Sequence, residues 1–156
     1  MKTNIHRLLL FLAALCLASP LLHAQEQVMV RARVFNVPKN AADALMASSD
    51  LHSGVRETLV RLQELVARNQ ATIMANPSVQ TKIGAMATSD GVMKFMAQVA
   101  KQGSELDVEA HMLYGEQSLR TSHHVKRGES VFMGSFDAAS GGNGTAGSIL
   151  VFLTIQ

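Results

Sequence analysis

Carboxylates and a histidine alternate along one segment of the sequence, Glu105 to Leu113, in the order Glu105, Asp107, Glu109 and His111. Residues two apart in a β-strand share a face. An antiparallel neighbour that places His124 opposite Asp107 would add a second histidine to this face. Histidine nitrogens and carboxylate oxygens are zinc ligands. However, His123 and His124 are consecutive and must point to opposite faces. We interpret Asp107 and His124 as a cross-strand charge pair, and we predict no metal-binding residue.

A second candidate for chemistry is the glycine-rich segment Gly142 to Gly147, which matches the dinucleotide fingerprint G-x-G-x-x-G. That fingerprint follows a strand, opens a helix and has an acidic residue about 20 positions later. Here an apolar segment, Ile149 to Ile155, follows instead. We predict a flexible loop and no cofactor.

The sequence offers no evident nucleophile. Its single cysteine, Cys16, lies in an apolar N-terminal segment, there is no G-x-S-x-G motif, and the serines near Gly134 have no obvious base. We therefore predict no catalytic residue and a protein that is not an enzyme.

Methionine is frequent, and methionine side chains can bind copper or form adaptable binding surfaces. In a chain without tryptophan, we interpret them as filling the hydrophobic core. The methionines concerned are Met74, Met86, Met93, Met96, Met112 and Met133.

The first 24 residues have the composition of a cleaved secretory signal peptide. Lys2 and Arg7 are followed by an apolar run and by Leu22-His23-Ala24, which is the order of a basic region, a hydrophobic region and a small residue before the cut. We predict export to the periplasm or outer membrane of a cell envelope, and a single domain over residues 25–156.

Charge excludes one function class. Lys2 and Arg7 belong to the predicted signal peptide, so the exported part has as many basic residues as its 12 acidic ones. Without a basic run, and with few aromatic residues to stack on bases, nucleic-acid binding is not supported.

The elements that must position these residues begin with a predicted strand over Gln27 to Val37, in which apolar residues alternate. Arg31 and Arg33 share a face of it. Partly solvated arginine stems at a sheet edge are the simpler interpretation, and ligand binding is the alternative. Pro38 should end the strand, and Asn40 should cap a short helix over Ala41 to Ser48.

An amphipathic helix is predicted over Val55 to Arg68, with its apolar side on a sheet and Asn69 at its C-terminus. Further strands should follow, separated by turns at Asn76-Pro77, Gly84, Asp90-Gly91 and Gly103-Ser104.

The strand Glu105 to Leu113 should fold back onto Ser118 to Lys126. In the favoured register the opposed pairs are Leu106 with Val125, Met112 with Leu119, Glu105 with Lys126 and Asp107 with His124. A hairpin across Gly128 should then lead to Val131 to Phe136, where Gly134 permits close approach of another chain segment.

The segment Ile149 to Ile155 is apolar or β-branched almost throughout. It is too short to span a membrane as a helix and is typical of a strand buried on both faces. We expect it in the middle of a sheet. The predicted fold class is α+β: an antiparallel, β-rich domain with one short and one longer helix near the start of the exported part.

Several segments, in this order, resemble the core β-domain of secretins, the outer-membrane ring channels of bacterial type II and type III secretion and type IV pilus systems. They are Ala71 to Thr81, Gly84 to Ala87, Gly103 to Val108, Val125 to Gly134 and Leu150 to Ile155. Two features depart from that family: Ser140 to Gly147 replaces its proline-rich segment, and no proline follows the last strand.

The resemblance implies a structural role and carries over no catalytic residue. We expect a non-catalytic assembly component of a secretion or envelope complex that forms a homo-oligomer or docks to a larger complex through strand edges, with outer-membrane association as an option. The alternative is a periplasmic small-ligand-binding module or small hydrolase that uses the polar face around Asp107, Glu109, His111 and His124.

Overall fold

The computed structural model describes residues 26–48, 51, 54–138 and 147–156. The predicted signal peptide and all of the predicted glycine-rich loop except Gly147 lie outside these residues. The described elements are β1 (Gln27–Pro38), α2 (Lys39–Ala47), α4 (Val55–Ala67), β2 (Thr72–Ala75), β3 (Ser78–Lys82), β4 (Met86–Ser89), β5 (Lys94–Gln102), β6 (Glu105–Tyr114), β7 (Gln117–Val125), β8 (Ser130–Ala138) and β9 (Gly147–Ile155).

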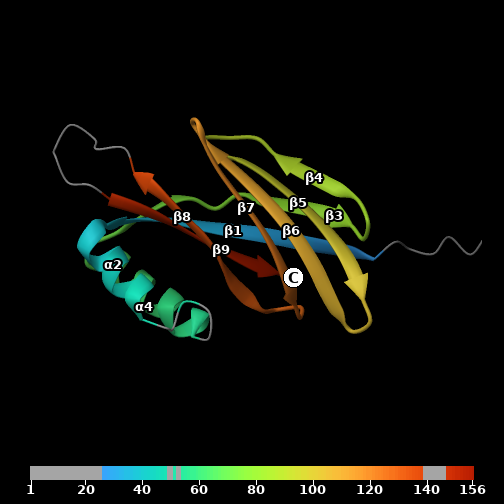
Figure 1. Ribbon diagram of the computed structural model, residues 1–156, viewed down its shortest axis with the longest axis horizontal. Coiled ribbons are helices and arrows are strands. Elements are labelled where there is room, and N and C mark those ends of the chain that lie inside the picture. The colour runs from blue at the N-terminus through green and yellow to red at the C-terminus, as the bar shows by residue number, and fades with distance from the viewer. Residues whose placement is uncertain (1–25, 49–50, 52–53, 139–146) are drawn as a thin grey trace, which may run out of the picture.

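The predicted α+β class is confirmed, because helices α2 and α4 accompany two antiparallel sheets in the described part of the chain. Sheet A has the order β2-β1-β9-β8, and β3 pairs with β1 beyond the end of β2. Sheet B has the order β4-β5-β6-β7. Sheet B covers one face of sheet A, and α2 and α4 lie on the other (Figure 1). The described part of the chain contains no helix long and apolar enough to cross a membrane.

Strand β1 has the predicted alternation of buried and exposed residues as far as Val34. A register shift against β2 then follows, and both Val34 and Phe35 are buried. The expectation that Arg31 and Arg33 mark a sheet edge is wrong. β1 pairs with β9 on one side and with β2 and β3 on the other, so both arginines lie on the face of an interior strand.

Strand β9 occupies the predicted central place, between β1 and β8. Its alternate side chains are buried on opposite faces of sheet A. Val151 and Leu153 face sheet B, whereas Leu150 and Phe152 face the helices. A strand covered on both sides needs apolar residues at nearly every position, which accounts for the run from Ile149 to Ile155.

Helix α2 starts two residues earlier than predicted, and Asn40 is not its cap. Pro38 is the N-cap residue, as suits its fixed φ, and Asn40 lies in the first turn, where its Oδ1 accepts a hydrogen bond from the N–H of Ala41 (2.9 Å). The short helix buries Ala42 and Leu45 against the sheet.

Helix α4 lies on sheet A as predicted and buries Val55, Leu59 and Leu62. Asn69 follows it with a φ of 58°. The N–H of Asn69 bonds to the C=O of Val66, and that of Gln70 to the C=O of Leu65. This pair of bonds is the Schellman arrangement, which requires a left-handed residue such as Asn or Gly after the helix.

In sheet B the predicted register is confirmed: Leu106 pairs with Val125, Asp107 with His124, and Met112 with Leu119. The β4–β5 connection contains Asp90-Gly91, and β5 turns into β6 through Gly103-Ser104. The apolar face of β6 packs toward sheet A, and its polar face is partly exposed.

The predicted hairpin across Gly128 is wrong, because β7 belongs to sheet B and β8 to sheet A. The chain changes sheets at this turn, and β8 pairs with β9 instead. Gly134 does permit a close approach, as expected. A Cβ atom there would lie 2.6 Å from Cδ1 of Leu119 on β7.

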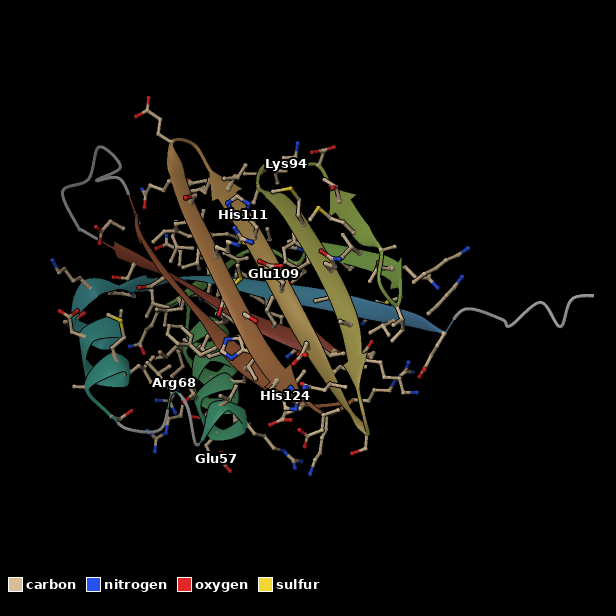
Figure 2. The ribbon with its side chains drawn as sticks, turned by 45° about the vertical axis from the view of Figure 1, so that its right-hand side comes forward. Glu57, Arg68, Lys94, Glu109, His111 and His124 are labelled. Carbon is tan, nitrogen blue, oxygen red and sulfur yellow. The ribbon has the colours of Figure 1, made fainter. Side chains whose placement is uncertain are left out.

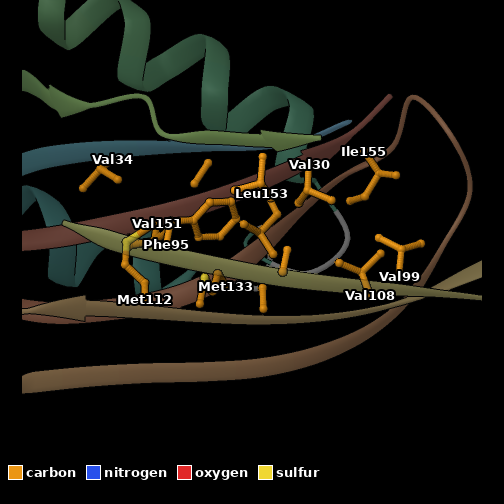
Figure 3. Packing of buried hydrophobic residues seen from close by; sticks show 14 of the residues in the cluster. Val30, Val34, Phe95, Val99, Val108, Met112, Met133, Val151, Leu153 and Ile155 are labelled. Carbon is orange, nitrogen blue, oxygen red and sulfur yellow. The ribbon is translucent and has the colours of Figure 1, made fainter. Parts of the chain in front are cut away.

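The larger core fills the space between the sheets, where Val30 and Leu153 of sheet A meet Phe95 and Val108 of sheet B (Figure 3). The interpretation of methionines as core residues holds for Met93, Met112 and Met133, which are buried. It is wrong for Met86, which is 64% exposed.

Candidate functional site

The polar face predicted around Asp107 exists on the outer side of sheet B. Since alternate side chains of β6 are buried and those of β7 on the same side are at least partly buried, strand alternation turns the others outward. Glu109, His111 and His124 lie at successive levels along this face (Figure 2). The remaining members of the face are Glu105 and Asp107 of β6 and Arg120 and Ser122 of β7.

His124 bridges two carboxylates. Its Nδ1 contacts Oδ1 of Asp107, and its Nε2 lies 2.7 Å from Oε2 of Glu105. The hydrogen bond to Asp107 raises the pKa of His124 above its ordinary value of 6.5, and the charges of Asp107 and Glu105 add to this rise, while partial loss of hydration opposes it. The predicted pairing of Glu105 with Lys126 is also present, at 4.0 Å.

A second ion pair lies farther along the face. Nε of Arg120 donates to Oε1 of Glu109 at 2.9 Å, and its Nη2 contacts the same oxygen. His111 is directly opposite Arg120 in the register. The predicted separation of the two consecutive histidines is confirmed: His123 is paired with buried Val108 on the inner face.

These ion pairs are better suited to holding β6 and β7 together than to catalysis or metal binding. Both ring nitrogens of His124 face carboxylates, so neither is free to take a proton from a nucleophile. No group of three or more potential ligands capable of holding a metal is found among the described residues.

A depression on the same face is small. It has a volume of about 160 Å³ and is bordered by Met86, Met96, Glu109, His111 and Arg120. Small-molecule sites are usually clefts of about 300–1,000 Å³. The face therefore gives limited room for the ligand that the alternative function requires.

Two larger cavities lie on the opposite side of the molecule, beside α4. One has a volume of about 430 Å³ and the other about 420 Å³, and Arg33 and Gln63 line both. Sequence reasoning placed Arg31 and Arg33 at a solvated edge and so missed these cavities. No local signal could have revealed them, because they depend on the pairing of β1 with the distant strand β9 and on the position of α4.

The structure thus defines an antiparallel α+β sandwich with an ion-paired outer face on one sheet and arginine-lined cavities on the other. No protein-family model, curated protein or solved structure matches this chain.

Proposed function

We propose that this protein is an exported, non-catalytic assembly component of a cell envelope, with a secretin-like β-domain, that joins copies of itself or a larger secretion complex through strand edges. The segments that resemble secretins lie in β2, β3, the start of β4, β6, β8 and β9 and in the turn between β7 and β8. They lie in both sheets.

The observation that carries the proposal is the exposed apolar surface at one edge of sheet B. Strand β4 is an edge strand of that sheet and pairs only with β5 among the described strands. Met86 begins β4 and is 64% exposed, and Val92, in the following turn, is 80% exposed.

Such an edge favours association. An unpaired strand edge offers backbone N–H and C=O groups to another chain, and proteins that remain monomeric usually protect it with charge, proline or a covering segment. Strand β4 has the sequence Met-Ala-Thr-Ser, with neither charge nor proline. Sheet A has a similar edge at β2, where Ile73 is 47% exposed.

The proposal is tested by the native mass and the cellular fraction of the exported protein, determined by light scattering and membrane fractionation. We expect an envelope fraction that contains an oligomer or a complex recovered by crosslinking. Met86→Lys combined with Val92→Lys places charge on the edge and should reduce the assembled mass.

Val60→Lys is the matched control, because Val60 is an exposed valine on α4, far from β4 in the fold, and is 50% exposed. It should leave the assembled mass unchanged. A wild-type protein that is strictly monomeric, with no partner recovered by envelope crosslinking, would refute the proposal.

A further inference from the structure

The two cavities beside α4 share Arg33 and Gln63. We call them together the arginine groove and define it by Arg31, Arg33, Arg56, Gln63, Ser78 and Thr154. The first cavity is lined by Arg31, Arg33, Gln63, Ser78 and Thr154, and the second by Arg33, Arg56 and Gln63. We propose that the arginine groove binds a small oligophosphate, a ligand with at least two phosphate groups.

The groove exists because the helices cover only part of sheet A. Phe35, Leu150 and Phe152 lie beneath α2 and α4. Toward the other end of the same face, the register places polar side chains side by side across four strands: Ser78 opposite Arg31, Arg31 opposite Thr154, and Thr154 opposite Ser130. A continuous polar row of this kind supplies hydrogen-bond donors on a rigid surface.

The three arginines of the groove lack carboxylate partners. Among the described residues, no Asp or Glu oxygen lies within 4.0 Å of a guanidinium nitrogen of Arg31, Arg33 or Arg56. Arg31 donates only to Sδ of Met29 (3.1 Å). Several basic residues elsewhere are paired, as Arg120 is with Glu109 and Arg127 with Glu26.

The spacing of the arginines selects a ligand with more than one anionic group. Arg31 and Arg33 are two residues apart on one face of β1, which separates their Cα atoms by about 6.6 Å. Arg33 lies between the cavities, and Arg56 approaches the second one from the first turn of α4. Arg31 lines only the first cavity and Arg56 only the second, so two or three linked phosphates that extend along the groove can contact all three guanidinium groups.

Phosphate fits the donors better than carboxylate does. Guanidinium groups bind phosphate oxygens in pairs. Each phosphate also has oxygens left for neutral donors such as Gln63, Ser78 and Thr154. Glu129 also lines the second cavity, and its carboxylate accepts a hydrogen bond from the N–H of Lys126 (2.9 Å).

The test is calorimetric titration of the purified protein with sodium tripolyphosphate, inorganic phosphate and citrate. We expect tripolyphosphate to bind more tightly than the other two. Arg33→Gln should weaken tripolyphosphate binding by about tenfold or more, since charge-assisted hydrogen bonds are worth about 1.5–3 kcal/mol. Because Arg33 is exposed, the thermal stability of the unliganded variant should be unchanged.

Arg68→Gln is the matched control, because it removes the same charge from the end of α4 without touching the groove. It should change the affinity by less than about twofold. A second titration with vesicles containing phosphatidic acid, which carries one phosphate, tests whether a lipid headgroup is bound instead. Arg33-dependent binding of tripolyphosphate supports the proposal, and a preference for phosphatidic acid or for inorganic phosphate would overturn it. Absence of binding to any phosphate probe, preference for citrate, or equal weakening by Arg33→Gln and Arg68→Gln would overturn it.

Discussion

The substitution Gly134→Ala tests whether the close approach of the two sheets at this position requires a glycine. Gly134 lies in β8 with a φ of 145°, which side chains rarely allow. An added Cβ would lie 2.6 Å from Cδ1 and 3.0 Å from Cδ2 of Leu119. Carbon atoms pack best at about 3.5–4.0 Å, so the methyl group would be about 1 Å too close.

Two costs follow from this geometry. Forcing a methyl group into a packed interface costs about 1–3 kcal/mol, and an unfavourable φ costs about 1–3 kcal/mol. Since the methyl groups of Leu119 can move in part, we expect Gly134→Ala to lower the free energy of unfolding by about 2–5 kcal/mol. With a urea dependence of about 2 kcal/mol/M, the midpoint should fall by about 1–2.5 M.

The measurement is urea denaturation of four proteins: the wild type, Gly134→Ala, Leu119→Ala and the double variant. In the Leu119→Ala background, the steric cost disappears and only the backbone cost of about 1–3 kcal/mol should remain. Gly91→Ala is the control, because its Cβ would meet only the O of Met93, at 3.8 Å, and should change stability by less than about 0.5 kcal/mol. A Gly134→Ala cost as small as that of Gly91→Ala, or one that Leu119→Ala leaves unchanged, would refute the steric account.

The other predictions concern His124 and Asn69. Because the folded protein raises the pKa of His124, its charged form stabilises the fold fully below pH 6.5, and this stabilisation is lost as the pH rises through the raised pKa. Asp107→Asn should flatten that pH dependence of stability in denaturation experiments. Glu109→Gln, which removes the partner of Arg120, should keep it. If both variants gave the same pH profile, Asp107 would not be the cause of the raised pKa of His124. Asn69→Ala should lower the unfolding free energy by about 1 kcal/mol, because its φ of 58° is costly for alanine, while Asn69→Gly should not; a loss in both variants would argue against a backbone cause.

The strand order of sheet B was predictable because its strands are joined by short turns and each strand has one face toward solvent. The alternation in β6 fixes which side chains are buried, and the opposite charges of Asp107 and His124 then favour one register over its neighbours. The polar face of the candidate site follows from that register alone. Local signals were sufficient because every pairing in this sheet joins consecutive strands.

Sheet A was predictable only in part, because its pairings join distant segments. The apolar character of β9 indicated a central strand, yet nothing local identified β1 as its partner or placed β8 on its other side. The turn at Gly128 looks like a hairpin because turn residues do not show whether two strands hydrogen-bond or cross into different sheets. The arginine groove was missed for the same reason, since it depends on the place of β1 within sheet A and on where α4 lies.

The central position of β9 also has a consequence for the folding kinetics. Both β1 and β8 depend on β9 for their longest pairings, and the β1–β9 contact closes a loop on the order of a hundred residues. Contacts of such high sequence separation slow folding. A chain synthesised only as far as β8 can form sheet B but not sheet A, so it should remain incompletely folded and available to chaperones until β9 has been made.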